Sequence, residues 1–499
     1  MNKIEKTQEQ KEIISSAKKG NNIIIQAFAG CAKTSTLKML STVICKETLY
    51  IAFNSEIASE ARKDFPEWTD CRTVHSIAYE YIVKGTKYRP RLSGFYPFQE
   101  AKKILSSYID IYEEETQYMI ISNVQELIKE YCQSSCFKLC DFVKGYIKGN
   151  VEFAEDMEEE YINMSNHLWN CLTNKQETWK IGHDLYLKMF QLSKPDLSNK
   201  YKIILLDEMQ DSNPVTLDIF YRQQGKVQLI GVGDKYQGIY AWRGAVDAML
   251  SVPEGFITKY LSTNFRFNQD LADQANRILS YMGEEKGITG MGNLTELTSK
   301  AVLVRNNSTL FNYLIQAANE GKKVFAIADL KDLFSQMYTA ASLLYCKKSE
   351  KPKFGPYPHK KIAAYSTWKE LVADKSPDVR KIANLVAKCQ PTVHAAITKA
   401  RSCLVENEEL ADITLVTGHK SKGREWDEVT LSNDFLPVVG EYDTIEEKIG
   451  EFISEQGMNL CYVAVTRARV KVNLSPEWED FLKLLNHLKD SFAMNGDLT

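Results

Sequence analysis

Asn22–Leu40 of this chain reads NIIIQAFAGCAKTSTLKML: an apolar run, then small residues, then a helical pattern. Residues 22–26 have the β-branched character of a buried strand. A helix follows that carries Leu37, Met39 and Leu40. The small residues between the two leave backbone N–H groups at a helix N-terminus open to an anion. The stretch therefore predicts a strand–loop–helix unit that binds phosphate.

The side chains of this loop predict a nucleotide site. We expect Lys33 to reach the β- and γ-phosphates and the Thr34 hydroxyl to ligate Mg²⁺. The pattern G-x-x-x-x-G-K-[ST] is imperfect, because Ala27 and Ala32 replace both outer glycines, and a methyl group at Ala32 restricts the backbone. Affinity or turnover is expected to suffer. The expected nucleotide contacts in the loop and first turn are Ala29, Gly30, Cys31, Ala32, Lys33, Thr34 and Ser35.

An acidic pair supplies the second half of the predicted site. Asp207 and Glu208 follow the apolar run that ends at Leu206. At the end of a buried strand, Asp207 is expected to hold Mg²⁺ with Thr34, and Glu208 to polarise an attacking water. Gln10, upstream of the loop, is a candidate to contact an adenine edge, although such a residue taken alone is more often an ordinary helix residue.

A third loop combines an amide with an aromatic side chain. Residues 233–245, GDKYQGIYAWRGA, follow the strand-like run Val227–Val232. Gln237 offers an amide to a phosphate, and Trp242 offers an indole on which any base can stack. The loop is therefore suited to link nucleotide hydrolysis to an unpaired base. The simpler interpretation is a core tryptophan with a hydrogen-bonded glutamine.

Length and composition exclude several classes of protein. A chain of 499 residues with 44% hydrophobic and 25% charged residues predicts several globular domains. No apolar run has transmembrane length, and residues 1–20 are polar, so we expect no signal peptide and no membrane partner. Eleven cysteines without a secretion signal indicate reduced thiols, typical of the cytoplasm or nucleus. The net charge of −3 argues against a protein that coats duplex DNA.

The order of elements predicts an α/β fold with parallel sheets, because strand-like runs alternate with helical patterns. Ligands then bind beyond the carboxyl ends of the strands, where the polar clusters fall. The expected strands are Asn22–Ala27, Thr48–Phe53, Tyr201–Leu206, Val227–Val232, Val302–Arg305, Ile413–Thr417 and Val470–Leu474.

Two stretches are interpreted as insertions. Residues 86–185 are mostly helical in pattern, with an acidic run, Glu155–Glu160, expected to face solvent. Residues 336–404 include the lysine- and proline-rich run Lys347–Lys361, which predicts a loop. A solvated loop is the default interpretation of that run, and contact with nucleic-acid phosphate is the alternative.

Four cysteines raise the question of a metal cluster. Cys132, Cys136 and Cys140 are four residues apart, and Cys171 is available as a fourth ligand. However, the first three fall on one helical face with apolar neighbours across residues 124–143, and free cysteine behaves as a small buried hydrophobe. We therefore expect no cluster, which iron analysis of anaerobically purified protein would check.

These motifs, in this order, resemble the superfamily 1 DNA helicases of the UvrD/PcrA type, and most of all the compact branch that contains the F-box DNA helicases. The resemblance spans nearly the whole chain. It implies two RecA-like, parallel-sheet P-loop domains, each with a mostly helical insertion. Its further segments here are Phe53–Ser55, Thr73–Ser76, Lys180–Gln191, Asn264–Arg266, Thr417–Asp427 and Tyr462–Ala468.

The resemblance also implies roles for individual residues. Gln237 would sense the γ-phosphate, Arg266 and Arg467 would act on it, Phe265 would stack on adenine, and Glu425 would contact the nucleotide. Arginines delivered to the γ-phosphate stabilise the charge that spreads over its oxygens during transfer. The residues implied to contact single-stranded DNA are Phe53, Asn54, Thr73, His75, Tyr240, Trp242, Arg243, Thr417, His419 and Lys420.

The implied domain boundaries are residues 1–85 with 186–262 (1A), 86–185 (1B), 263–335 with 405–499 (2A) and 336–404 (2B). The chain departs from the family at Ala32 and at Glu455–Cys461, which lacks an acidic-basic cluster. Only about 20 residues precede the phosphate loop, so we expect no F-box. The 2B insertion is much shorter than in UvrD.

The resemblance implies an ATP- and Mg²⁺-dependent DNA helicase, a monomer that translocates 3′ to 5′ on single-stranded DNA and acts at single-strand/duplex junctions. Replication, repair or recombination proteins are the expected partners, and the cytoplasm the expected location, or the nucleoid or host cytoplasm for a phage protein. One alternative is a translocase that strips proteins such as recombinase filaments from DNA and unwinds weakly. Another is a non-catalytic DNA-binding scaffold with a degenerate nucleotide pocket.

Overall fold

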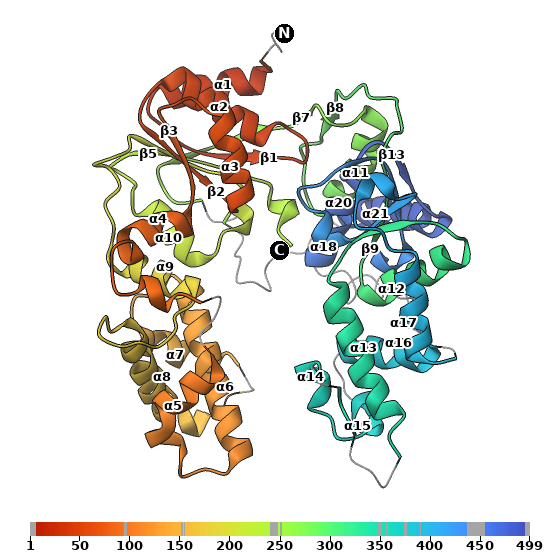
Figure 1. Cartoon of the computed structure of the whole chain (residues 1–499). Coiled ribbons are helices and arrows are strands. Elements are labelled where there is room, and N and C mark those ends of the chain that lie inside the picture. The colour runs from red at the N-terminus through yellow and green to blue at the C-terminus, as the bar shows by residue number, and fades with distance from the viewer. Residues whose placement is uncertain are drawn as a thin grey trace. The chain divides into compact units, whose positions relative to one another are not determined.

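The computed structural model describes residues 6–93, 97–150, 153, 155–239, 248–249, 252–347, 352–355, 358–373, 377–389, 391–436 and 455–494. The chain forms two compact units, Met1–Ser262 and Thr263–Thr499 (Figure 1). Each unit contains a large parallel sheet with helices packed against it, which confirms the predicted α/β class. The division into 1A, 1B, 2A and 2B stays a prediction.

A six-stranded parallel sheet organises the first unit, in the order β3-β2-β4-β5-β1-β6. Its inner strands are continuous apolar runs, as expected where both faces of a parallel sheet are covered. The carboxyl ends of β1, β4 and β5 meet at one edge of the sheet, where the polar loops begin. The strands are β1 (Asn22–Ala27), β2 (Thr48–Ala52), β3 (Thr69–Thr73), β4 (Ile203–Leu206), β5 (Gln228–Gly233) and β6 (Phe256–Leu261).

In the first unit, the helices that lie between η2 and α9 along the chain pack on one another, and the remaining helices form a first set (Figure 1). The first set is α1 (Gln8–Lys18), α2 (Lys33–Ile44), α3 (Ser55–Asp64), α4 (Val74–Ala78), η1 (Tyr79–Val83), η2 (Arg89–Arg91), α9 (His183–Leu192), η4 (Met209–Asp211), α10 (Pro214–Tyr221) and η5 (Lys235–Gln237). The second set is α5 (Phe98–Ile109), α6 (Glu114–Gln133), α7 (Leu139–Lys148), η3 (Glu155–Met157) and α8 (Glu158–Thr173).

The second unit has a five-stranded parallel sheet in the order β10-β11-β9-β12-β13, and a short parallel pair, β7-β8. The strands are β7 (Thr263–Asn264), β8 (Thr289–Gly290), β9 (Lys300–Val304), β10 (Val324–Ile327), β11 (Ile413–Thr417), β12 (Trp426–Leu431) and β13 (Ala468–Asn473). The helices are α11 (Gln269–Tyr281), α12 (Asn307–Asn319), α13 (Leu330–Leu344), α14 (Lys360–Ala363), α15 (Trp368–Ala373), α16 (Pro377–Lys388), α17 (Val393–Ser402), η7 (Glu408–Leu410), α18 (Gly418–Ser421), η8 (Asn433–Phe435), α20 (Glu455–Val465) and α21 (Pro476–Met494).

All seven predicted strands are present, with ends shifted by up to two residues, but β3, β6, β7, β8, β10 and β12 were missed. Of these, β3, β6 and β10 lie at the edges of the two large sheets. An edge strand faces solvent and carries polar residues, as in β3 with Asp70 and Arg72, so its apolar run is interrupted. The loop predicted at Lys347–Lys361 lies partly outside the described residues, and α14 begins at Lys360.

The cysteine-bearing segment differs from prediction, because residues 124–143 do not form one helix. α6 ends at Gln133 and α7 begins at Leu139, so Cys136 lies in the turn between them. Cys132 is buried. Among the described residues, no three His, Cys, Asp or Glu side chains are grouped as a metal site.

A buried lysine fixes the turn that follows α6. Lys188 on α9 is fully buried, and its ammonium donates to the carbonyl oxygens of Ser134 (2.9 Å) and Cys136 and lies 4.2 Å from the centre of the Tyr131 ring. The Gln191 amide, one turn further along α9, donates to the carbonyl oxygen of Ser135 at 2.9 Å. Side chains of α9 therefore hold the end of α6 by hydrogen bonds to the backbone of the turn that follows it.

Among the described residues, no helix combines the length and the apolar composition that a bilayer crossing requires.

We predict that Lys188 makes the stability of the protein pH-dependent. Burial lowers its pKa from 10.5 to about 8. Between these values the unfolded chain holds a proton that the native protein has released, so the contribution of Lys188 to stability increases with pH. Denaturant unfolding of wild type and Lys188→Met at pH 7.5, 8.5 and 9.5 should show wild type gaining relative to the variant. A difference that is constant with pH would contradict this.

Candidate functional site

The predicted phosphate loop joins β1 to α2 and contains two residues in the left-handed region. Gly30 has φ +70° and Ala32 has φ +57°. Glycine adopts this conformation freely, but in alanine the Cβ atom crowds the backbone. Ala32 also directly precedes α2, where no side chain caps the helix. The substitution noticed in the sequence is thus a point of backbone strain, at the place where helix N–H groups are exposed.

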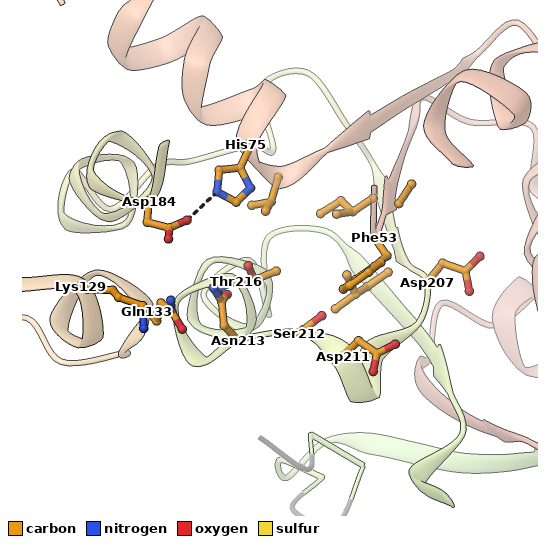
Figure 2. Close-up of a pocket in the computed structure, with 14 residues that line it drawn as sticks. Phe53, His75, Lys129, Gln133, Asp184, Asp207, Asp211, Ser212, Asn213 and Thr216 are labelled. Carbon is orange, nitrogen blue, oxygen red and sulfur yellow. Dashed lines mark hydrogen bonds and ion pairs between the residues drawn. The ribbon is translucent and has the colours of Figure 1, made fainter. Parts of the chain in front are cut away.

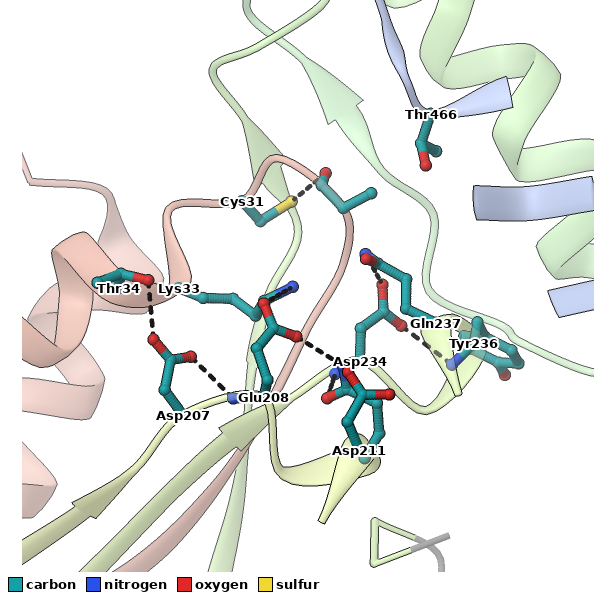
Figure 3. Close-up of polar contacts among 12 residues, drawn as sticks. Cys31, Lys33, Thr34, Asp207, Glu208, Asp211, Asp234, Tyr236, Gln237 and Thr466 are labelled. Atoms are coloured by element: carbon teal, nitrogen blue, oxygen red, sulfur yellow. Dashed lines mark hydrogen bonds and ion pairs between the residues drawn. The ribbon is translucent and has the colours of Figure 1, made fainter. Parts of the chain in front are cut away.

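Asp207 connects three elements at the end of β4 (Figure 3). Its carboxylate accepts hydrogen bonds from the Thr34 hydroxyl at 2.8 Å, the Tyr50 hydroxyl at 2.6 Å and the Glu208 backbone N–H at 2.9 Å. Burial raises the pKa of this carboxyl, as does the charge of Glu208, whereas the Tyr50 and Thr34 hydrogen bonds act in the opposite direction. The structure thus brings the two predicted magnesium ligands together.

Lys33 and Glu208 form the adjacent ion pair, with 3.5 Å between Nζ and Oε1. Glu208 has φ +49°, the left-handed conformation, and the Gln210 amide donates to its other carboxylate oxygen at 2.6 Å. The predicted phosphate-binding lysine and the predicted water-polarising carboxylate therefore lie side by side. Carboxylate and hydroxyl oxygens at Asp207 and Thr34 are ligands that Mg²⁺ prefers, so this donor set fits the predicted ion.

A buried polar network links this site to the loop after β5. Asp234 is fully buried, and its carboxylate accepts from Gln26 on β1 at 3.2 Å and from the Gln237 amide at 2.8 Å. The side-chain oxygen Oε1 of Gln210 accepts a hydrogen bond from the Asp234 backbone N–H at 3.0 Å. Glu208 and Gln237 therefore share a chain of contacts through Gln210 and Asp234. Gln237 is thus a hydrogen-bonded glutamine, as the simpler interpretation of this loop predicted. Its hydrogen bonds also belong to a network that reaches Glu208.

Gln10 lies at the start of α1 and is buried. It forms a capping box with Thr7, and its amide donates to the Thr36 hydroxyl on α2 at 3.2 Å. The neighbouring Glu9 carboxylate accepts from the backbone N–H and hydroxyl of Ser262, at 2.8 Å each. The contacts of Gln10 are those of a helix-terminal residue that also ties α1 to α2. Its adenine contact stays a prediction.

A pocket of about 440 Å³ extends from Asp207 along the ends of β2 and β4 (Figure 2). Phe53, 41% exposed, lies along its wall, and His75 and Asp184 lie at the far side from Asp207. His75 Nε2 is 3.1 Å from Asp184 Oδ1, and this hydrogen bond lowers the pKa of the Asp184 carboxyl. Two predicted DNA contacts thus share a pocket with the predicted magnesium ligand.

Asn54 and Thr73, two other predicted DNA contacts, do not line this pocket. The Asn54 side chain caps α3 by accepting from the Ile57 N–H, and the Thr73 side chain caps α4 by accepting from the Ser76 N–H. Both side chains thus have clear structural roles. Tyr240, Trp242 and Arg243 lie outside the described residues.

In the second unit, Arg266 and Glu425 form an ion pair with 2.5 Å between Nε and Oε2. Phe265, beside Arg266, is 41% exposed. Two residues with predicted roles at the nucleotide, Arg266 and Glu425, thus come together within this unit although they are far apart in sequence. Thr417 is buried at the end of β11, whereas Lys420 on α18 is exposed and His419 partly so.

Arg467, in contrast, is 2% exposed, and protein groups accept its hydrogen bonds. Its guanidinium donates to the carbonyl oxygens of Val463 (2.9 Å) and Arg424 (3.3 Å) and to the Thr466 hydroxyl (3.1 Å). These bonds join the end of α20 to the loop before β12. The structure therefore gives Arg467 a structural role, and its action on phosphate stays a prediction.

Several residues of the site were missed in the sequence. Tyr50, Gln26 and Asp234 sit within or after apolar strands, and Lys129 and Gln133 line the pocket from α6. A polar residue inside an otherwise apolar strand, such as Gln26, was the available signal, because buried polar groups require partners. No local pattern marks Gln133, since only the fold brings α6 to the sheet edge.

Comparison with known proteins gives matches along most of the chain. Residues 6–254 match the UvrD/REP helicase N-terminal domain, and residues 328–476 match the UvrD-like helicase C-terminal domain. F-box DNA helicase 1 of Gallus gallus is 28% identical over 97% of this chain and 50% of its own length. F-box DNA helicase protein 1 of Schizosaccharomyces pombe is 26% identical over 94% of this chain and 57% of its own.

A shorter match, 33% identical, covers 18% of this chain and 13% of the ATP-dependent DNA helicase PcrA of Staphylococcus epidermidis. The chain spans about half the length of the F-box helicases that it matches.

We predict that Ala32→Gly stabilises the protein by about 0.5–1 kcal/mol. Relief of the left-handed conformation at alanine, about 1–2 kcal/mol, exceeds the entropy that glycine adds to the unfolded chain. Ala29→Gly is the matched control, because Ala29 is buried in the same loop without a positive φ. That variant should lose about 1 kcal/mol. Denaturant unfolding measures both, and a loss of stability in Ala32→Gly would refute the strain at this position.

Proposed function

Because the chain belongs to the UvrD-like helicase family, we propose that it hydrolyses ATP and uses that reaction to move along single-stranded DNA and separate duplex strands. The observation that carries the proposal is the shared position of Asp207. Its carboxylate accepts a hydrogen bond from the Thr34 hydroxyl at the phosphate loop, and Asp207 also lines the pocket that contains Phe53 and His75. One side chain thereby adjoins both candidate binding sites.

The residues around Asp207 have different roles in the proposed hydrolysis of ATP. Lys33 neutralises phosphate charge, and the N–H groups at the start of α2 bind phosphate oxygens. Glu208, held by Gln210, orients and polarises the attacking water. Thr34 and Asp207 would hold Mg²⁺, which when bound neutralises charge on the phosphate oxygens. Tyr50 fixes the orientation of Asp207 without contacting the nucleotide.

Gln237 and Arg266 are proposed to respond to the γ-phosphate. Gln237 is bonded to Asp234, which contacts Gln210 beside Glu208, so a change at Glu208 has a path to the loop after β5. Arg266 is bonded to Glu425, which holds the guanidinium in place until a phosphate oxygen competes for it. Arg467 and Phe265 retain their family-implied roles as proposals, at the γ-phosphate and adenine respectively.

The proposed DNA path includes Phe53 and His75 at the pocket, Trp242, which follows β5 in the sequence, and His419 and Lys420 in the second unit. Flat aromatic faces accept any base, which suits a motor that must pass over all sequences. Four parts of this proposal rest on family resemblance: movement 3′ to 5′, action as a monomer, a cytoplasmic location, and the division into 1A, 1B, 2A and 2B.

Two assays run side by side distinguish a helicase from a translocase that strips proteins from DNA. A gel-based assay measures duplex unwinding, and a filament-displacement assay measures the removal of protein from DNA.

We predict that single-stranded DNA stimulates ATP hydrolysis and that Lys33→Ala lowers the stimulated rate at least about 100-fold, because a charge that stabilises the transition state is lost. Lys38→Ala, on the exposed part of the same helix, is the matched control and should retain wild-type activity. Steady-state phosphate release measures both. A rate without DNA stimulation, or activity that survives Lys33→Ala, would sink the motor proposal.

We predict that Trp242→Ala raises the concentration of single-stranded DNA needed for half-maximal stimulation by about fivefold or more, because stacking contributes about 1–3 kcal/mol per base. ATP binding should change little. Trp242→Phe keeps an aromatic face and should lie between wild type and Trp242→Ala. An unchanged DNA requirement in Trp242→Ala would show that the indole does not hold a base.

A further inference from the structure

The pocket beside Phe53 has one wall that comes from outside the sheet. Lys129 and Gln133 lie one helical turn apart on α6 and line the pocket, opposite the sheet-edge residues that lead to Asp207 (Figure 2). Their helix belongs to the group α5–α8, which the sequence did not connect with any binding role. The helical region therefore contributes side chains to the candidate DNA site.

Gln133 has an unsatisfied polar atom in this wall. Its side-chain carbonyl oxygen is buried, with no hydrogen-bond partner among the described residues. An unpaired buried acceptor is unfavourable, and folded proteins rarely retain one without a reason. The terminal torsion of glutamine is broad, so the amide can turn toward a molecule in the pocket at little energetic expense. An occupant that offers an N–H group would satisfy this oxygen.

The backbone at Gln133 is fixed in position. The three residues that follow it are bonded through their carbonyl oxygens to Lys188 and Gln191 on α9, as described above. The end of α6 therefore cannot move away when a ligand enters, and the amide meets the ligand from a preorganised wall. The buried ammonium of Lys188, which performs no proposed catalytic step, acquires a positioning role.

The chemistry of the pocket fits the pairing edge of a nucleobase. Phe53 offers a flat, half-exposed face for stacking. A glutamine amide offers one acceptor and two donors side by side. Each of the four bases carries a donor next to an acceptor on its Watson–Crick edge, so one amide can pair with any of them. In a duplex that edge is occupied by the complementary base, and in a single strand it is free.

We propose that Gln133 hydrogen-bonds the Watson–Crick edge of an unpaired base stacked on Phe53. The pocket thereby selects single-stranded DNA by its free pairing edge and not by its sequence. This inference rests on the proposed DNA-binding function and assigns to α6 the step that distinguishes unpaired from paired bases. Sequence tolerance follows, because the amide meets a donor and an acceptor on every base.

The test uses DNA in which the pairing edge alone is blocked. Fluorescence anisotropy of the full-length protein measures binding to labelled oligothymidylate and to the same oligomer made of N3-methylthymidine, which lacks the N3–H donor. Wild type should bind the unmodified oligomer about 3–10-fold more tightly, the range for one hydrogen bond. Gln133→Leu should bind the unmodified oligomer more weakly by the same factor and should show little preference between the two.

Two further variants make the result specific. Gln133→Met keeps the length of the side chain without the amide and should behave as Gln133→Leu does. Gln316→Leu, an exposed glutamine on α12, should retain the wild-type preference. An equal preference in wild type and Gln133→Leu, with DNA still bound, overturns the role of Gln133 alone. Failure of wild type to bind unmodified DNA overturns the proposed function and this inference with it.

Discussion

The burial of one carboxylate, Asp207, is the constraint on which the rest of the site depends. A buried carboxylate must be hydrogen-bonded, and three elements supply the partners: the start of α2, strand β2 and the backbone after β4. These bonds set how closely the phosphate loop approaches the acidic pair. Because Asp207 also borders the pocket beside Phe53, the same constraint places a candidate DNA site next to a candidate nucleotide site.

The sequence was sufficient for the parts of the fold that local chemistry determines. The apolar strands at the centre of each sheet and the loop from β1 to α2 were predicted, because a fully buried parallel strand is a continuous apolar run. The edge strands β3 and β6 were missed, since solvent on one side permits polar residues such as Asp70 and Lys259. The turn that divides α6 from α7 was missed because the apolar spacing continues across it.

The candidate site was predictable only where residues lie in motifs. Lys33, Thr34, Asp207 and Glu208 come together as expected. The network through Gln26, Gln210 and Asp234 depends on tertiary contacts, as does the pairing of Arg266 with Glu425, which no spacing along the chain indicates. Arg467 illustrates the limit of motif reasoning, because its guanidinium is enclosed by carbonyl oxygens of its own unit. Gln133 joins the site only because Lys188 and Gln191 hold the end of α6.

The most direct test measures the thermodynamic coupling between nucleotide binding and single-stranded DNA binding. It asks whether Asp207 links the candidate nucleotide site to the candidate DNA site. Titration calorimetry would give the affinity for an oligothymidylate with and without a non-hydrolysable ATP analogue and Mg²⁺, and the affinity for that analogue with and without DNA. We expect each ligand to change the affinity of the other by the same factor, and Tyr50→Phe, which frees the Asp207 carboxylate from one partner, to reduce that factor. Affinities that are independent of each other in wild type would contradict this expectation.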